Sequence, residues 1–271
     1  MTAPSPRPFR VPDFRAAKTA GRKVVMLTCY DALFAKLLDT QVDVLLVGDS
    51  LHQVLGGHDT TLGATLDQMI YHAAAVCRGA SHAMVVVDLP FLSYQVSVEE
   101  AIRNAGRVLR ETGAHAVKLE GGRAMAPTVR ALVERGIPVM GHLGLTPQSL
   151  NLIGGYKVQG RTATQAEAML ADAHALEEAG ACAFVLELVP DALATQISQA
   201  VGIPTIGIGA GAGCDGQVLV LHDMLGLTEE FRPRFLKHYA ELAEDVRGAA
   251  ARYAAEVRDG TFPGPEHGFR G

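Results

Sequence analysis

The chain has 271 residues, of which 48% are hydrophobic and 20% are charged, and its formal net charge at pH 7 is −5. This length is close to the roughly 250 residues of an eightfold α/β barrel, and the hydrophobic share is ample for one large core. The negative charge argues against a nucleic-acid-binding protein, and no apolar run reaches the roughly 18 residues of a membrane-spanning helix.

Short apolar segments alternate with segments of helical length along most of the chain. A short amphipathic helix near 14–18 comes first. The predicted strands span residues 24–29, 43–48, 84–88, 115–119, 137–141, 182–187, 204–208 and 217–221. The predicted helices span residues 31–39, 66–78, 98–111, 127–135, 164–179, 190–200 and 229–258. Eight such strands predict a closed parallel (β/α)8 TIM barrel of the α/β class instead of an open sheet.

The composition has no break that would mark a second domain. We therefore predict that residues 1–271 form one barrel domain with a short N-terminal leader and a C-terminal helical region. Residues 1–10 lack the apolar core of a secretory signal. The four cysteines are scattered and form no C-x-x-C pair, which is typical of reduced thiols in a cytoplasmic protein and indicates neither zinc nor disulfides.

Several predicted strands are followed by an acidic residue. Asp49, Asp88 and Glu120 end or follow the second, third and fourth strands, and Glu187 ends the sixth. In a parallel barrel these strand ends share one mouth, where the chemistry of such folds resides. Three carboxylates gathered without thiolates suit a hard divalent cation, with Mg²⁺ the best match. Each acid alone could instead cap a helix or a turn, an alternative that their number disfavours.

A lysine interrupts the apolar fourth strand. Lys118 lies two residues before Glu120, so both side chains point to the same face. A buried lysine is costly unless it is paired or used, and a purely structural salt bridge with Glu120 or Asp88 stays open. His142 lies at the end of the fifth strand, where a lone histidine is more often structural than catalytic. The glycine-rich run 207–213 could hold a phosphate but lacks the spacing of a nucleotide-binding loop.

With these residues placed, the sequence resembles the ketopantoate hydroxymethyltransferase family from about Thr28 to His267. The motifs that carry the resemblance are LVGDSL at 46–51, GHDTTL at 57–62, VKLEGG at 117–122, GHLGLTPQ at 141–148, GGYKVQG at 154–160 and IGIGAG at 206–211. Several long motifs in one order are more specific than any short pattern. One departure is His52-Gln53, where the family usually has glycine and an apolar residue, and we expect it to be tolerated.

The resemblance implies an enzyme, commonly a homodecamer, of pantothenate and coenzyme A biosynthesis. Such enzymes transfer a hydroxymethyl group from 5,10-methylenetetrahydrofolate to the 2-keto acid 3-methyl-2-oxobutanoate, giving 2-dehydropantoate. The resemblance also implies one Mg²⁺ per subunit, with Asp49, Asp88 and Glu120 as ligands, and a cytoplasmic location.

By the same resemblance, Asp49, Ser50, Asp88 and Lys118 contact the keto acid. Glu187 is the implied general base that removes the C3 proton in Mg-assisted enolate formation, and His142 is a possible additional site residue. An alternative with the same fold is a Mg-dependent carbon–carbon lyase of the phosphoenolpyruvate/isocitrate lyase type. Such lyases usually carry a Lys-Cys-Gly-His-type loop, which this sequence lacks. A barrel that only binds an anion would need no base beside the cation cluster.

Overall fold

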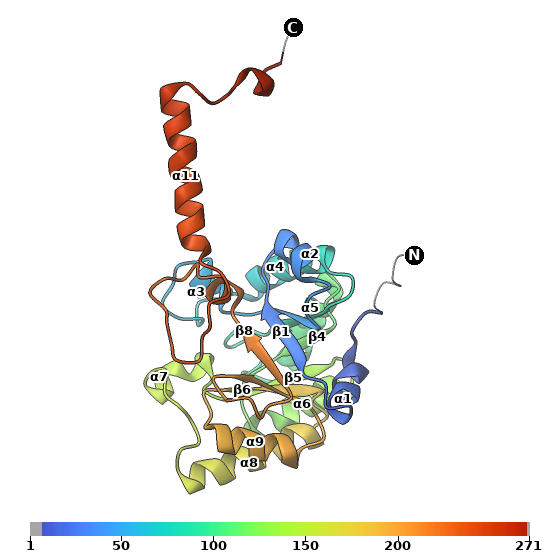
Figure 1. The fold of residues 1–271 in the computed structure, drawn as a ribbon. Helices are drawn as coiled ribbons and strands as arrows, with labels where there is room; N and C mark the ends of the chain where they lie inside the picture. Colours follow the sequence, from blue (N-terminus) through green and yellow to red (C-terminus); the bar gives the residue numbers. More distant parts are fainter. Residues whose placement is uncertain (1–6, 270–271) are drawn as a thin grey trace. The chain divides into compact units, whose positions relative to one another are not determined.

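The structure is a computed structural model that describes residues 7–269. Its centre is a closed barrel of eight parallel strands in chain order, which confirms the predicted (β/α)8 fold (Figure 1). The strands are β1 (Val24–Thr28), β2 (Val44–Val47), β3 (Met84–Asp88), β4 (Ala116–Lys118), β5 (Val139–Gly144), β6 (Ala183–Glu187), β7 (Thr205–Ile208) and β8 (Gly216–Leu219). Because all strands run the same way, every β-to-α loop lies at one end of the barrel.

The helices follow the strands as a barrel requires. They are α1 (Val11–Thr19), α2 (Ala32–Leu38), α3 (Leu51–Val54), α4 (Leu66–Gly79), α5 (Val98–Thr112), α6 (Ala126–Val133), α7 (Leu150–Ile153), α8 (Ala163–Glu178), α9 (Asp191–Ala200), α10 (Leu221–Met224) and α11 (Leu242–Asp259), with 3₁₀ turns at Arg123–Met125, Pro147–Ser149 and Pro265–His267. Local sequence fixes several ends. Thr65 and Gln68 form a reciprocal capping box at the start of α4, and Gly113, at φ 79°, ends α5 in the left-handed conformation.

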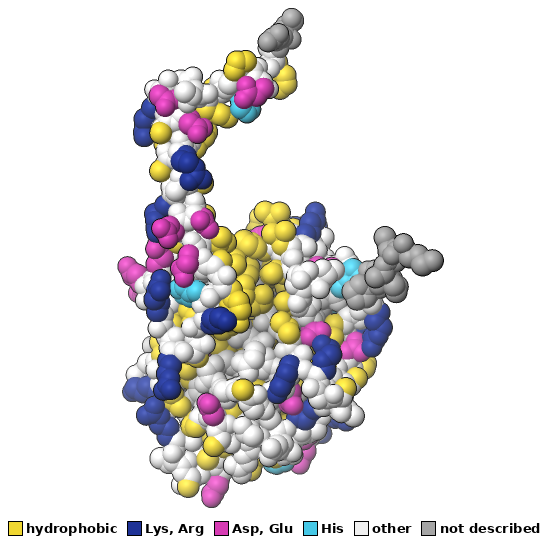
Figure 2. Space-filling model, in the orientation of Figure 1, with side chains coloured by type: hydrophobic (Ala, Val, Ile, Leu, Met, Phe, Trp, Pro, Cys, Tyr) yellow, Lys and Arg dark blue, Asp and Glu magenta, His cyan; other side chains and the backbone are white. Residues whose placement is uncertain are grey.

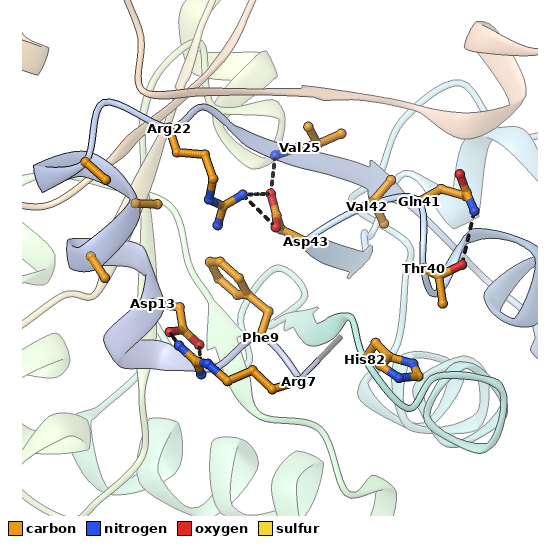
Figure 3. Close-up of a pocket in the computed structure, with 13 residues that line it drawn as sticks. Arg7, Phe9, Asp13, Arg22, Val25, Thr40, Gln41, Val42, Asp43 and His82 are labelled. Carbon is orange, nitrogen blue, oxygen red and sulfur yellow. Dashed lines mark hydrogen bonds and ion pairs between the residues drawn. The ribbon is translucent and has the colours of Figure 1, made fainter. Parts of the chain in front are cut away.

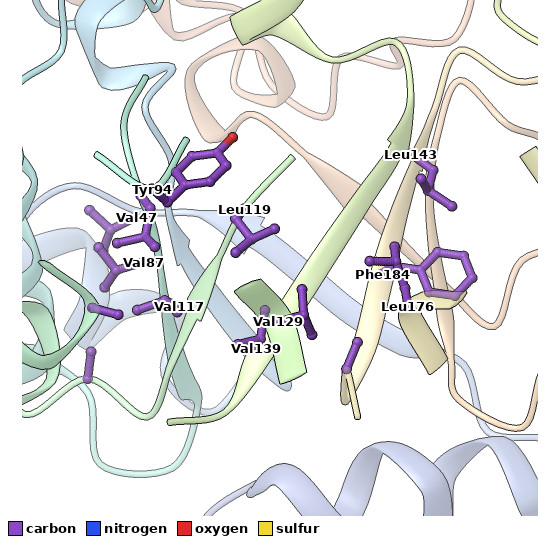
Figure 4. Close-up of a cluster of buried hydrophobic side chains, with 14 of the residues drawn as sticks. Val47, Val87, Tyr94, Val117, Leu119, Val129, Val139, Leu143, Leu176 and Phe184 are labelled. Carbon is purple, nitrogen blue, oxygen red and sulfur yellow. The ribbon is translucent and has the colours of Figure 1, made fainter. Parts of the chain in front are cut away.

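Side chains alternate between two hydrophobic layers along each strand. Val47, Val87, Val117 and Val139 point outward, and they belong to one cluster with Val129 and Leu176 of the helices, which is drawn in Figure 4. Their neighbours in sequence point inward and fill the barrel: Met26, Val44, Leu46, Met84, Val86, Ala116, Met140, Ala183, Val185, Ile206 and Val218. The barrel is therefore a packed core, and only the side chains at its two ends are available for chemistry.

Helix α1 closes the amino-terminal end of the barrel. Phe9 and Phe14 pack edge to face, with ring centroids 5.1 Å apart, and both belong to the interior cluster. Lys18 Nζ lies 2.7 Å from Asp215 Oδ2 and donates to the Ser198 carbonyl at 2.6 Å. These contacts confirm the short helix predicted near 14–18. The first part of the predicted leader, residues 1–6, lies outside the described residues.

The structure corrects four predicted boundaries. β5 continues to Gly144, so His142 lies within the strand instead of at its end. The polar loops after β2 and β5 contain the short helices α3 and α7. The sequence did not predict these helices, because each has too few apolar residues to form a helical pattern. The last strand ends at Leu219, because the next residues already turn into α10. The predicted helix over 229–258 is wrong in its first half, since α11 begins at Leu242, and Pro233 disfavours helical backbone at the residue before it.

Internal contacts divide the chain into a barrel unit that ends at Val220 and a second unit from Leu221 onward. In the second unit, α11 has no buried residue along its 18-residue length. Figure 2 shows basic and acidic side chains interspersed along α11 and across the visible face of the barrel, without a continuous basic stripe on that face. No helix among the described residues combines the length and the apolar character needed to cross a membrane. The prediction of one domain for the whole chain stays a prediction.

Candidate active site

The barrel brings the three predicted acids together at its carboxyl-terminal mouth. Asp49 follows β2, Asp88 ends β3 and Glu120 lies just beyond β4, and all three are at least 94% buried, with exposed fractions of 4%, 3% and 6%. The backbone N–H of Asp49 donates to Asp88 Oδ2 at 3.1 Å. At Gly48, between β2 and Asp49, a Cβ would lie 2.8 Å from Ser50 Oγ and would crowd that side chain. The mouth thus holds a compact acidic cluster.

Two residues that sequence reasoning missed hold this cluster. The Gln148 side chain donates to Asp49 Oδ2 at 2.9 Å, and its backbone N–H donates to Glu120 Oε2 at 3.0 Å. Its Oε1 accepts from the Tyr94 hydroxyl at 2.7 Å. That hydroxyl also accepts from the Glu120 backbone N–H at 3.1 Å. Gln148 ends the motif at 141–148, so a signal for it existed, whereas nothing in the sequence marks Tyr94.

Lys118 balances part of the negative charge. Its Nζ lies 2.7 Å from Asp88 Oδ1, and both side chains are about 95% buried, with 5% and 4% exposed. Burial alone would lower the pKa of Lys118, but the charges of Asp88, Glu120 and Asp49 outweigh it and raise that pKa above its usual range. The lysine therefore stays cationic, and the salt bridge anticipated with Asp88 is present. Lys118 can pair with Asp88 and still contact a substrate, because both side chains lie at the barrel mouth.

The pKa of Asp49 shows that the acidic cluster carries more negative charge than Lys118 neutralises. Burial, followed by the charges of Asp88 and Glu120, raises its pKa to about 8, although Lys118 and the Gln148 hydrogen bond oppose this shift. A carboxyl that tends to hold its proton near neutral pH lacks a counter-charge. A divalent cation would supply one.

His142 connects the acidic cluster to Glu187. Its Nδ1 lies 3.5 Å from Glu120 Oε1 and its Nε2 lies 3.4 Å from Glu187 Oε2, while the imidazole is 3% exposed. Burial and the Lys118 charge would each lower its pKa, but the Glu120 and Glu187 carboxylates raise it to about 9. Neither ring nitrogen makes a well-formed hydrogen bond within residues 7–269, so the two close contacts act through charge. The structure thus places His142 between two candidate functional acids.

Glu187 is the most accessible acid of the group, with 17% of its side chain exposed. The next residue, Leu188, adopts φ 46°, a left-handed conformation that is strained for leucine. Its N–H donates to the Ile208 carbonyl at 2.9 Å, and its own carbonyl accepts from the Gln159 N–H at 2.8 Å. These bonds hold the turn that follows β6 directly beside the Glu187 carboxylate.

Ser50 and the His52 loop lie beside the acids. Ser50 Oγ is 2.9 Å from the buried Tyr30 hydroxyl, which orients it at the mouth. The His52 and His58 rings stack with centroids 3.8 Å apart and planes 9° from parallel, and His52 Nδ1 lies 2.8 Å from the Thr60 carbonyl. His52 therefore contacts its own loop, whereas Gln53 Nε2 donates both to the Asp59 carbonyl at 3.0 Å and to the Tyr156 hydroxyl, in the loop after β5, at 3.1 Å.

The oxygens of Asp49, Asp88 and Glu120 suit Mg²⁺, but several of them already have hydrogen-bond partners. Among the described residues, no three His, Cys, Asp or Glu side chains are arranged so that they could hold a metal ion together. Gln148 already occupies one oxygen each of Asp49 and Glu120, and Lys118 occupies one of Asp88. Mg²⁺ usually keeps several waters and takes one or two carboxylates together with substrate oxygens. Buried acidic oxygens with excess negative charge suit that mode better than an all-protein cage.

Two cavities lie at opposite ends of the barrel. The larger, about 510 Å³, lies among residues that precede β1, β2 and β3, including Arg22, Asp43 and His82 (Figure 3). Arg22 is paired with Asp43 there at 2.9 Å, and none of the mouth acids lines this cavity. The smaller, about 270 Å³, includes His142 in its wall. None of the mouth acids lines the smaller cavity either, but it lies at the carboxyl-terminal ends of the strands, where barrel enzymes carry their chemistry, and adjoins the mouth through His142.

Comparison with known proteins places the chain clearly. The sequence model described as ketopantoate hydroxymethyltransferase matches residues 8–265. A protein of Syntrophus aciditrophicus named 3-methyl-2-oxobutanoate hydroxymethyltransferase is 57% identical over 94% of each chain. One of the same name from Paracoccus denitrificans is 58% identical over 95% of this chain and 93% of its own length.

Solved structures resemble the fold at much lower identity. A 2,3-dimethylmalate lyase of the PEP mutase/isocitrate lyase superfamily has a TM-score of 0.58 at 19% identity, covering 94% of this chain and 89% of its own. A phosphonopyruvate hydrolase solved with oxalate and Mg²⁺ has a TM-score of 0.60 at 12% identity, covering 96% and 91%. At these identities the likeness establishes the shared barrel and nothing further.

Proposed function

Because the chain belongs to the ketopantoate hydroxymethyltransferase family, we propose that it transfers a hydroxymethyl group from 5,10-methylenetetrahydrofolate to 3-methyl-2-oxobutanoate, giving 2-dehydropantoate. The observation that carries the proposal is the pairing, at one mouth, of a buried acidic cluster with a separate, more accessible carboxylate. A 2-keto acid needs a cation site for its adjacent oxygens and a base for the hydrogen on C3. The mouth offers a candidate for each need.

We propose Asp49, Asp88 and Glu120 as the residues that hold Mg²⁺, directly or through water. When bound, the cation polarises the keto group and makes the hydrogen on C3 more acidic. Asp49 would then be ionised, because the cation supplies the positive charge that the neighbouring acids Asp88 and Glu120 do not provide. Gln148 orients the acids, because it donates to the carboxylates of Asp49 and Glu120, and the Tyr94 hydroxyl in turn holds the Gln148 side chain.

Lys118 is the candidate cationic contact to the keto acid, and Ser50 is the candidate hydroxyl. The Lys118–Asp88 bond aims the ammonium at the acids, so a substrate carboxylate beside them would meet a fixed positive charge. Fixed charges that need no reorganisation stabilise developing negative charge most effectively. Lys118 would therefore bind the substrate and stabilise the state that follows proton removal.

Glu187 is the candidate general base. Its carboxylate lies at the mouth, 3.4 Å from His142, and partial exposure leaves room for a substrate carbon beside it. Abstraction would leave electron density on C3, which attacks the methylene carbon of the folate and forms the new carbon–carbon bond. Both bonds from that carbon to nitrogen would break, water would supply the hydroxyl oxygen, and tetrahydrofolate would leave. The proton would be held on Glu187 near His142, whose raised pKa keeps a positive charge beside the base before abstraction. A positioned base of this type contributes roughly 10²–10⁴-fold in rate.

The lyase alternative shares the fold but is disfavoured by sequence. Relatives that are 57% and 58% identical over nearly the whole chain carry the hydroxymethyltransferase name, whereas the lyase of similar fold is 19% identical. The test is incubation with 3-methyl-2-oxobutanoate, Mg²⁺ and 5,10-methylenetetrahydrofolate, followed by detection of 2-dehydropantoate. The matched control is 3,3-dimethyl-2-oxobutanoate, which has no hydrogen on C3 and should give no product. Wild-type protein that yields none from the first keto acid would refute the proposal.

We also propose a homodecamer in the cytoplasm. Exposed apolar side chains on α11, namely Val246, Tyr253 and Val257, support self-association, because the second unit leaves them uncovered. All four cysteines are free thiols, which supports a reducing compartment. Light scattering coupled to size-exclusion chromatography would test the assembly, and a monomer at micromolar concentration would contradict it.

A further inference from the structure

The smaller cavity, about 270 Å³, has no task in the proposed handling of the keto acid. It lies between the end of β5, the loop that follows β4 and the first half of α8. His142 belongs to its wall and also lies 3.4 Å from Glu187 Oε2. An occupant of this cavity would therefore be separated from the candidate base by one side chain.

Backbone forms much of the cavity wall. Four lining residues are glycines: Gly121, Gly122, Gly144 and Gly160. At Gly122 a Cβ would lie 2.2 Å from Asp172 Cγ, and at Gly144, with φ 90°, it would lie 2.2 Å from the Glu187 carbonyl oxygen. Only glycine lets these two loops approach so closely. Peptide groups, which are flat and carry both donors and acceptors, therefore line this part of the cavity.

The remaining walls are apolar with a polar edge. Leu143, Ala168 and Met169 supply apolar surface, while Thr146, Gln159, Gln165 and Asp172 supply hydrogen-bonding groups. Apart from His142, no lining residue is basic, so the cavity is not built for a phosphate or another anion. Such walls suit a flat heterocycle that is uncharged and has hydrogen-bonding atoms around its rim.

Asp172 provides the most specific feature. Its Oδ1 accepts from the Arg123 backbone N–H at 3.0 Å and from Arg123 Nε at 2.8 Å. Its Oδ2 accepts no hydrogen bond from any residue in the range 7–269, and 26% of the Asp172 side chain is exposed, so this oxygen is open to a ligand. A carboxylate with a free oxygen, fixed by an arginine, suits adjacent N–H donors on a ring.

We propose that this cavity binds the bicyclic head of the one-carbon donor, a 2-amino-4-oxo pteridine, with its amino and ring N–H groups toward Asp172. The inference rests on the proposed function, which requires the donated carbon to reach C3 of a keto acid held beside Glu187. Reacting atoms must come within about 3–3.5 Å, so the part of the donor that carries the one-carbon unit would have to extend past His142 toward Glu187. The cavity is too small for the whole cofactor, so the aminobenzoyl-glutamate part extends into solvent.

The test combines three variants with two measurements. Ala168→Leu fills the cavity, Asp172→Asn weakens the acceptor, and Glu167→Leu adds the same bulk to α8 at an exposed position outside the cavity. Calorimetry measures binding of 5-formyltetrahydrofolate, an air-stable folate, to the full-length protein. Deuterium incorporation at C3 of 3-methyl-2-oxobutanoate in D₂O, with Mg²⁺ and without folate, measures the keto-acid half of the reaction.

We expect folate binding to weaken at least tenfold in Ala168→Leu and in Asp172→Asn, and by less than twofold in Glu167→Leu. Exchange at C3 should persist in both cavity variants, which also reports that they fold. Wild-type folate affinity in both cavity variants would overturn the inference. Wild-type protein that binds folate but neither exchanges nor transfers would instead contradict the proposed function. If Ala168→Leu loses exchange through misfolding, the Asp172→Asn result decides.

Discussion

Replacing Gln148 with alanine should weaken the cation site without touching any candidate ligand. Gln148 is 6% exposed, and its side chain donates to Asp49 Oδ2 at 2.9 Å and to the Leu89 carbonyl at 3.0 Å. It also accepts from Tyr94 at 2.7 Å. Truncation leaves these buried groups without their partner, and each such loss costs about 1–3 kcal/mol when no water replaces it. Outer partners of metal ligands typically contribute 10–100-fold to metal affinity.

We therefore expect Gln148→Ala to raise the Mg²⁺ concentration needed for half-maximal C3 exchange by 10–100-fold. Calorimetric titration with Mg²⁺ gives the same quantity independently of turnover. Gln41→Ala, at an exposed position near the opposite end of the barrel, is the matched control and should not change it. Because the backbone N–H of residue 148 still donates to Glu120, the fold should survive. A Mg²⁺ dependence within twofold of wild type would refute the view that Gln148 positions the acids.

Three further changes test other parts of the molecule. Asp49→Asn should abolish Mg²⁺-dependent exchange while the thermal unfolding midpoint is retained or raised, because an amide is a poorer ligand but relieves the acidic cluster; near-wild-type exchange at ordinary Mg²⁺ would overturn the ligand assignment. His52→Gly should change keto-acid affinity only modestly, measured by calorimetry, since His52 contacts its own loop; a loss of turnover as large as that from removing Glu187 would contradict this. Asp39→Asn should destabilise the protein by about 1–3 kcal/mol at pH 7 in urea denaturation, because the amide lacks the acceptor oxygen that lies 2.9 Å from His82 Nδ1 and the negative charge that strengthens the three backbone N–H bonds to Oδ1. Burial would raise the pKa of Asp39, but the His82 and backbone hydrogen bonds outweigh it and lower that pKa, so its stabilisation is present above the usual carboxyl range and is lost as the pH falls. The difference between Asp39→Asn and wild type should therefore shrink below about pH 4, and a constant difference would contradict the assignment.

The sequence predicted the architecture because its hydrophobic pattern is strong. Runs such as Val44–Val47 and Met84–Asp88 have no polar face, and all eight predicted strands lie in the barrel. Acids at the ends of neighbouring parallel strands must meet at one mouth, so the convergence of Asp49 and Asp88 followed from topology alone. Their roles, unlike their positions, remain predictions.

The residues that hydrogen-bond to these acids could not be predicted from the local sequence pattern. Gln148 is 99 residues from Asp49, and Tyr94 is 26 residues from Glu120. Only the folded barrel determines which loop residues reach the mouth. Likewise, the strained turn at Leu188 has no sequence signature, because leucine seldom adopts a positive φ. The late start of α11 reflects a similar limit, since acidic and basic residues around 229–241 are compatible with a helix that Pro233 disfavours.

The most direct test of the proposed chemistry is hydrogen exchange at C3 of 3-methyl-2-oxobutanoate. Wild-type protein with Mg²⁺ in D₂O, followed by proton NMR, should replace that hydrogen with deuterium even without folate. Glu187→Gln keeps the shape but cannot accept the proton, so exchange should fall roughly 10²–10⁴-fold while calorimetry still detects keto-acid binding. Exchange at the wild-type rate in Glu187→Gln would show that another group removes the proton, and His142 would be the next residue to test.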